Sequence, residues 1–405
     1  MGMSTSSDDT VQRSSVAPSA RDAPPEVWPA VGGFVTLYLA IGALSPYLPV
    51  YYDSLGLPLD AIGLLVALYA GAAMLGAPAW GATADRFGSA RPIMAIAAGL
   101  AAIAAAVLGI ADGVLLIALS AVALALAMSG VMPILDARAL EIVAARRGQY
   151  AGLRVWGSGS FIVGVVATGW VTAQTGIGGM FLVLIPALAA TALIGFGIRS
   201  RPTLAPLSRL AAIRSVMSQP TLLLFLSVVL LTWTSSTTIN AFFSIHLVEI
   251  GAPQWLIGVA WAIGATIEIP LMLGFGRLIS AAGLPRLLLA GAALFALRAL
   301  SVVVTGDPLV VALSMLLHGG AFALFLVGGV MYVARLAPPG TAATAQGVLT
   351  ATVFGLAQII GPGIGGLVAG SLGLRATFLI AGVGSVIALT MLAWVLRRAP
   401  DAAAG

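Results

Sequence analysis

The sequence predicts an all-α polytopic membrane protein with twelve transmembrane helices in two pseudo-symmetric six-helix bundles. Composition, the spacing of apolar stretches and an internal repeat lead to this class. Of the 405 residues, 60% are hydrophobic and only 8% are charged, whereas soluble domains carry about 25% charged residues. So few charges cannot cover a soluble surface, which excludes a cytosolic enzyme, a disordered protein and a nucleic-acid-binding module. At about 20 apolar residues per crossing, the apolar content is enough for about twelve helices.

Apolar stretches, and the Gly, Pro and charged residues between them, define the individual helices. The expected spans fall into two sets of six on either side of a long connection that carries four arginines. They are 29–50, 60–80, 92–111, 114–135, 154–174 and 178–198, followed by 220–243, 254–275, 286–305, 309–333, 343–369 and 374–396.

These spans predict the domain organisation. We expect a first bundle over 29–198, a central cytoplasmic loop over 199–219 and a second bundle over 220–396. The flanking segments 1–28 and 397–405 are expected to be cytoplasmic tails, the first of them disordered because it lacks an apolar stretch. The first tail also lacks the pattern of a cleavable signal peptide.

The charges predict the orientation. All the basic residues are arginine, and most lie in alternate connections, whereas the opposite connections are mainly acidic. Because positively charged loops stay in the cytoplasm, both termini should be cytoplasmic, in a bacterial inner membrane. Cysteine is absent, which excludes disulfides and thiolate metal sites, and no metal or cofactor is expected. The acidic connections carry Asp53, Asp60, Asp112, Glu249 and Asp307.

An internal repeat relates the two halves. At an offset of 195 residues, identical residues recur around the second and eighth spans. Parallel repeats of this kind are typical of transporters that rock two bundles about a central site. The matches are Gly56, Pro58, Ile62, Gly63, Gly81, Gly88 and Arg91 with Gly251, Pro253, Ile257, Gly258, Gly276, Gly283 and Arg286.

The loop after the second span carries a motif. It contains Gly81, Asp85, Arg86, Gly88 and Arg91, in which Gly81 would allow close helix approach and Gly88 would turn the chain. This loop resembles the signature between helices two and three of the major facilitator superfamily. The resemblance implies that superfamily's fold and a gating role for these residues, although the loop is less basic than the usual form.

Ionisable residues inside an apolar span are costly unless they are paired or lie in a water-filled cavity, so they mark candidate sites. Asp136 ends one predicted helix and Arg154 opens the next, so a hairpin can bring them together. Either can hydrogen-bond a solute hydroxyl or carboxylate, and we expect Trp156 to lie beside them. Arg138 and Glu141 are expected to be loop residues that close this hairpin.

A second group lies in the other half. Glu268, Arg298 and His318 fall within three successive spans. They could neutralise one another inside the bundle, and a buried carboxylate with a neighbouring histidine is suited to handling protons. A glycine-rich stretch, 355–366, is expected to pack helices closely, with Gln358 a candidate for the cavity wall.

Both groups resemble those of lactose permease, and flanking residues such as Tyr47, Trp261 and Phe322 are similar to the phenylpropionic acid permease branch. The resemblance implies sugar or acid contacts at Asp136 and Arg154, and proton coupling through Glu268, Arg298 and His318. Two places differ from lactose permease. Ala321 replaces its proton-carrying carboxylate, and Phe161 replaces the tryptophan that stacks on the sugar.

The expected function is proton-coupled uptake of a small organic solute, such as a phenylpropionate-like acid or a sugar, by a monomer in the lipid bilayer. Efflux by proton antiport and nucleoside import are alternatives, although the fifth span lacks the proline-ended glycine signature of exporters. A membrane receptor or enzyme with the same fold is a further alternative. No soluble catalytic domain or metal-ligand cluster favours an enzyme.

Overall fold

The computed structural model describes residues 27–87, 90–146, 150–198 and 209–398, and the regular elements within these ranges are all helical. Eleven helical segments there are long and apolar enough to cross a membrane. The last, Ala342–Arg398, contains a break at Gly373 (φ 81°, ψ 169°) with helix on both sides, so it supplies two crossings. The predicted all-α class is therefore confirmed, with the twelve crossings that the sequence predicts.

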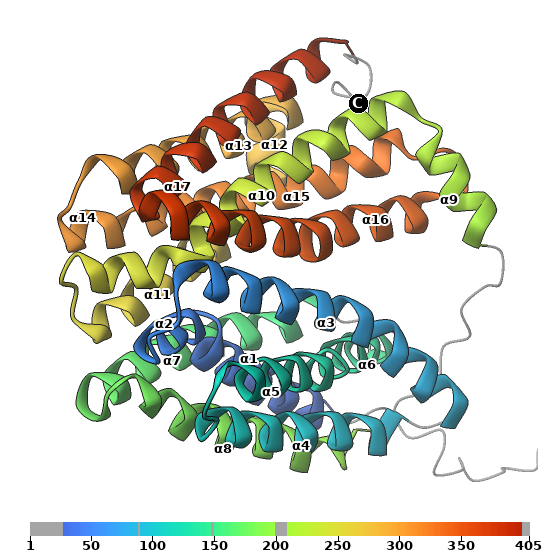
Figure 1. Ribbon diagram of the computed structural model, residues 1–405. Coiled ribbons are helices and arrows are strands. Elements are labelled where there is room, and N and C mark those ends of the chain that lie inside the picture. The colour runs from blue at the N-terminus through green and yellow to red at the C-terminus, as the bar shows by residue number, and fades with distance from the viewer. Residues whose placement is uncertain (1–26, 88–89, 147–149, 199–208, 399–405) are drawn as a thin grey trace, which may run out of the picture.

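The first half of the chain forms an N-terminal bundle, which Figure 1 shows below the second half. Its helices are nearly all apolar, as a bundle within a membrane requires. They are α1 (Trp28–Leu44), α2 (Leu48–Ser54), α3 (Leu59–Phe87), α4 (Ala90–Gly109), α5 (Val114–Met128), α6 (Val131–Arg146), α7 (Tyr150–Thr175), the short helix η1 (Ile177–Gly179) and α8 (Met180–Gly195).

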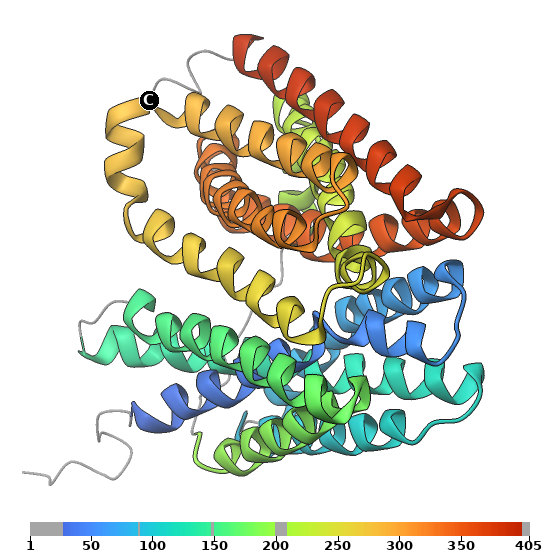
Figure 2. The same ribbon diagram turned by 90° about the vertical axis from the view of Figure 1, so that its left-hand side faces the viewer.

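The second half forms a C-terminal bundle, and Figure 2 shows the same separation after a turn of 90°. A short helix, α9 (Arg209–Met217), leads into it from the central connection. The remaining elements are α10 (Pro220–Glu249), α11 (Gln254–Leu273), α12 (Phe275–Ala282), α13 (Leu284–Val304), α14 (Pro308–Leu313), α15 (Met315–Leu336), α16 (Ala342–Ala351), the π-helical turn η2 (Thr352–Leu356) and α17 (Ala357–Arg398).

Several predicted spans are divided in the structure, among them the first and the fourth. The first breaks at Pro46, which has no N–H to continue the helix. The fourth breaks between Met128 and Val131, where the Trp80 indole donates a hydrogen bond of 2.7 Å to Leu126 O at the end of α5. The chain then continues as α6, so the prediction that Arg138 and Glu141 lie in a loop is wrong. They lie on this helix, and Arg138 Nη1 is 3.0 Å from Glu141 Oε2.

The internal repeat corresponds to a repeated local structure. Gly56 and Gly251 both adopt positive φ, 77° and 86°, which favours glycine. In each copy the N–H of the next residue bonds to the carbonyl five residues before it: Leu57 N to Tyr52 O and Ala252 N to Leu247 O. These are the hydrogen bonds of a Schellman motif, so the same glycine ends a helix in both halves.

The two bundles meet at the ends of the helices that border the acidic connections. A Cβ at Gly63 would collide with the backbone of Pro362 and Gly366, and one at Gly258 would collide with Val165 O. These close approaches join α3 to α17 and α11 to α7. They confirm that glycines in 355–366 allow close packing.

The bundles diverge toward the ends that border the arginine-rich connections, which we call the arginine side. A Cβ at Gly81 would have no described atom within 4 Å, and Gly276, its counterpart in the repeat, is also open. The expectation of close helix approach at Gly81 is therefore wrong in this conformation. The structure is closed on the acidic side and open between these helix ends on the arginine side.

Candidate functional site

A central cavity of about 380 Å³ lies between the bundles. Its wall comes from α1, α2 and α3 on one side and from α10, α11, η2 and α17 on the other. The size falls within the usual range for a small-molecule site. Much of the wall is aliphatic, and none of the described side chains that line it carries a formal charge. Its polar and aromatic members are Ser45, Tyr69, Thr237, Asn240, Trp261, Phe354 and Gln358, so the expectation that Gln358 lines the cavity is confirmed.

Hydrogen bonds between α10 and α17 hold this wall together. The Thr237 hydroxyl donates to Ala357 O at 2.8 Å, and the Thr238 hydroxyl donates to Gly361 O at 2.9 Å. Both hydroxyls also lie within hydrogen-bond distance of Thr234 O in their own helix, at 3.1 and 2.8 Å. The hydrogen bonds to Ala357 O and Gly361 O hold α10 and α17 together. Asn240 on α10 and Gln358 on α17 therefore belong to one continuous surface of the cavity wall.

Arg154 lies in the N-terminal bundle, near the start of α7. Its guanidinium carbon is 4.3 Å from the centre of the Tyr38 ring and 6.0 Å from that of Phe34. Asp136, on α6, also acts electrostatically on the Tyr38 hydroxyl. The structure therefore brings the predicted residues Asp136 and Arg154 to a shared neighbour, Tyr38. Gly157 leaves room for this arrangement, because a Cβ there would lie 2.9 Å from both Arg154 Nη1 and the Tyr38 ring.

The other two predicted solute contacts lie further from this group. Trp156 is 50% exposed, and two residues along a helix turn a side chain by about 200°, away from the face of Arg154. Phe161 lies seven residues after Arg154, so it is on the same face of α7 as Arg154 but two turns closer to the acidic side. Neither residue lines the central cavity.

Arg298 lies in the middle of α13 and is only 1% exposed. Its Nη1 donates to Asn240 Oδ1 at 2.8 Å and lies 3.0 Å from His318 Nδ1. Its Nη2 donates to the Met315 sulfur at 3.3 Å, and the ring of Phe243 lies 5.3 Å from the guanidinium carbon. The predicted association of Arg298 with His318 is thus present in the structure.

Glu268 does not join this pair. Among the residues that the structure describes, none donates a hydrogen bond to Glu268 or forms an ion pair with it. The reason is its position along α11. Gly264 packs against His318, whereas Glu268 lies one turn further toward the arginine side, on the helix face that it shares with Trp261 of the cavity wall. The expectation that Glu268, Arg298 and His318 neutralise one another is therefore wrong.

The loop motif is only partly described. Gly81 and Arg86 lie exposed at the end of α3, on the arginine side. Asp85 and Arg91 belong to α3 and α4, but the positions of their side chains lie outside the described structure, as does Gly88 altogether. The expected gating contacts of this motif therefore stay a prediction.

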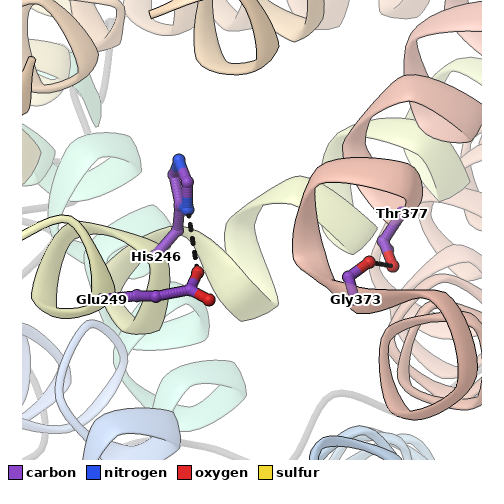
Figure 3. Close-up of polar contacts among 4 residues, drawn as sticks. All are labelled: His246, Glu249, Gly373 and Thr377. Carbon is purple, nitrogen blue, oxygen red and sulfur yellow. Dashed lines mark hydrogen bonds and ion pairs between the residues drawn. The ribbon is translucent and has the colours of Figure 1, made fainter. Parts of the chain in front are cut away.

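The acidic end of α10 carries a local pair. His246 Nδ1 is 3.3 Å from Glu249 Oε2, one turn further along the helix (Figure 3). Thr377 of α17 does not join it, because its hydroxyl donates to Gly373 O at 3.0 Å. The His246 ring packs edge-on against Phe378 at 5.2 Å. These contacts tie α10 to α17 on the closed side.

Sequence reasoning missed Asn240 and Tyr69. Neither carries a charge, so neither has the cost that singles out an ionisable residue within a span. Asn240 follows a run of Ser and Thr residues, whose hydroxyls can bond within their own helix. The available signal was that an amide has two N–H donors and a carbonyl oxygen, more than bonds within its own helix satisfy, and so requires further partners elsewhere.

Comparisons with known proteins agree with this architecture. A family model described as MFS_1 like family matches residues 32–380. The chain is 27% identical over 370 residues to a maltose permease of Geobacillus stearothermophilus, covering 90% of this chain and 93% of the relative. It is 23% identical to the uncharacterized transporter YwbF of Bacillus subtilis, covering 90% and 92%. The nucleoside transporter NupG superposes with a TM-score of 0.79 at 18% identity, covering 91% of this chain and 98% of NupG.

Proposed function

The chain belongs to the MFS_1 like family and is a multi-pass membrane transporter, and we propose that it takes up a small organic solute together with protons. The observation that carries this proposal is the central cavity, whose wall is shared by both bundles. A site between two bundles can face either side of the membrane in turn as the bundles rock. The similarity to a maltose permease supports a sugar as the first candidate solute that we propose, with phenylpropionate-like acids second.

The orientation follows from the arginines. Because positive loops are retained in the cytoplasm, we assign the arginine side and both termini to the cytoplasm of a bacterial cell. The conformation described here is then open inward and closed outward. Release of solute to the cytoplasm takes place from this state, and closure of the arginine side returns the cavity to the outside.

Glu268 is the proposed proton carrier. It lies on the cavity face of α11 with no partner among the described residues, and a carboxylate without a counter-ion favours its protonated form in an apolar region. Helices α7 and α11 run antiparallel, with Gly169 packed on Trp255 and Gly258 on Val165. The same register places Arg154 level with Glu268 on the arginine side.

This register suggests how closure could depend on the solute and the proton. When the arginine side closes, the guanidinium of Arg154 approaches the carboxylate of Glu268 from the opposite bundle. A solute between them, or a proton on Glu268, changes that attraction, and so couples transport to protonation. Asp136 and Tyr38 hold Arg154 in place on the N-terminal side.

The test is the pH change around de-energised, anaerobic cells that express the protein. Maltose, galactosides, nucleosides and 3-phenylpropionate are added in turn. We expect one class to make the medium alkaline and an Arg154→Ala strain to respond at least ~10-fold less, because a charge-assisted contact is lost. The same variant controls for acids that cross the membrane unaided. No response to any class, with protein confirmed in the membrane, would contradict proton-coupled uptake.

Glu268→Gln separates coupling from binding. The amide keeps the size of the side chain but cannot release a proton, so the variant should exchange internal for external solute. It should fail to accumulate solute in response to a pH gradient. Vesicles preloaded with labelled solute measure exchange, and vesicles placed under a pH gradient measure accumulation. Full accumulation by Glu268→Gln would exclude Glu268 as the proton carrier.

A further inference from the structure

The guanidinium of Arg298 is buried, and none of the described residues gives it a counter-ion. Its described hydrogen-bond partners are neutral: the Asn240 amide, the His318 ring and the Met315 sulfur. Its Nε is buried and has no hydrogen-bond partner among the residues that the structure describes. Among the described residues no carboxylate pairs with Arg298. A buried arginine of this kind is costly, so an arrangement that keeps it is expected to serve a function.

The contact with Arg298 fixes which way the Asn240 amide points. A guanidinium has donors only, so the atom that faces it must be the carbonyl oxygen Oδ1. The 2.8 Å bond from Arg298 Nη1 therefore turns the two N–H groups of Nδ2 the other way. Asn240 lies in the cavity wall, no described residue accepts from Nδ2, and that nitrogen is not buried. At this position the cavity wall therefore presents only the N–H donors of Asn240 Nδ2.

We propose that Asn240 donates a hydrogen bond to an acceptor oxygen of a neutral, hydroxylated solute, and that Arg298 is the positioning residue that sets the polarity of its amide. This inference rests on the proposed transport function. It adds a specificity-determining residue and a solute class. The charge of Arg298 acts on the solute through Asn240, because a hydrogen bond that the amide accepts makes its own N–H a stronger donor.

The rest of the wall fits an uncharged solute with several hydroxyls. Gln358 adds an amide that can donate and accept, and Tyr69 adds a phenol. Trp261 and Phe354 supply ring faces for the apolar face of such a molecule. With no ionised side chain in the wall, a charged solute would lose its hydration without a direct counter-ion.

Asn240→Asp tests the assignment, because it exchanges N–H for oxygen with almost no change in shape. The new carboxylate gives Arg298 the counter-ion that it lacks, so purified protein without solute should unfold at a temperature about 2–4 °C higher. The cavity donor is lost, so binding of the sugar that the wild type takes up, with maltose as the first probe, should weaken at least ~10-fold. Higher stability together with weaker binding is the expected result.

Two matched variants separate the causes. Gln358→Glu places the same charge in the same wall without a guanidinium beside it, and should give no rise in unfolding temperature. Asn240→Ala removes both the acceptor for Arg298 and the donor to the cavity, and should lower stability and binding together.

Three outcomes would overturn the proposal. The first is an Asn240→Asp protein that binds the sugar as the wild type does. The second is loss of stability and binding together, as a merely structural residue would show. Uptake of 3-phenylpropionate but of no sugar by the wild type would overturn the neutral solute class, while leaving proton-coupled uptake intact. Absence of any uptake would instead count against the proposed function.

Discussion

Arg154 and Arg298 are two arginines within apolar spans of opposite bundles, and their surroundings differ. Arg154 is partly exposed near the start of α7 and lies 4.3 Å from the centre of the Tyr38 ring, close to Asp136. Arg298 is 1% exposed and is held by neutral groups. Arg154 can direct its charge toward a solute or toward the C-terminal bundle. Arg298 acts on the cavity only through Asn240. Burial therefore separates an arginine that can bind from one that positions another residue.

Alanine at each arginine should separate these roles most strongly. Arg298→Ala leaves a cavity and removes the donor to Asn240 and His318, so the free energy of unfolding should fall by about 3 kcal/mol. Arg154→Ala should cost about 1 kcal/mol or less, because part of its stabilisation is a partly exposed cation–π contact. Thermal unfolding of the two purified proteins measures the difference. Equal losses would contradict the comparison.

Arg298→Met sharpens the same comparison by filling the space without the charge. Replacement of a buried charge by an apolar side chain of similar volume is often neutral, so the free energy of unfolding should stay within about 1 kcal/mol of the wild type. Solute uptake should still fall at least ~10-fold, since the Asn240 amide loses its fixed polarity. A stable variant with normal uptake would show that Arg298 positions nothing.

Tyr38 offers the smallest change, on the side of Arg154. Tyr38→Leu removes the ring beneath the guanidinium and should destabilise the protein by about 0.5–1 kcal/mol, whereas Tyr38→Phe keeps the ring and should have almost no effect. Unfolding temperatures of the pair measure the ring contact alone. If Tyr38→Phe matched Tyr38→Leu, the hydroxyl rather than the ring face would hold Arg154.

The sequence predicted much of the fold because the cost of polar groups in a membrane leaves a clear pattern. It also identified Arg298 and His318, which lie in contact. It failed where the position along a helix decides the outcome: Glu268 lies one turn beyond Gly264, which packs against His318, and Glu268 forms no described hydrogen bond with that histidine. Arg138 is helical because a new helix, α6, begins at Val131 after α5 has ended. Apolar content alone does not reveal this break.

The register of the eleventh crossing has a further consequence. The turn Thr352–Leu356 is a π-helix and so contains one more residue than α-helical geometry requires. The π turn absorbs this extra residue, so deletion of a single residue there would restore an α-helix and leave α17 nearly unrotated relative to α16. The face of α17 that holds Gln358 in the cavity and Gly366 against Gly63 would keep its direction. A deletion elsewhere in the crossing would instead rotate that face by about 100°. In evolutionary terms, this turn is where the crossing can absorb a change of length by one residue.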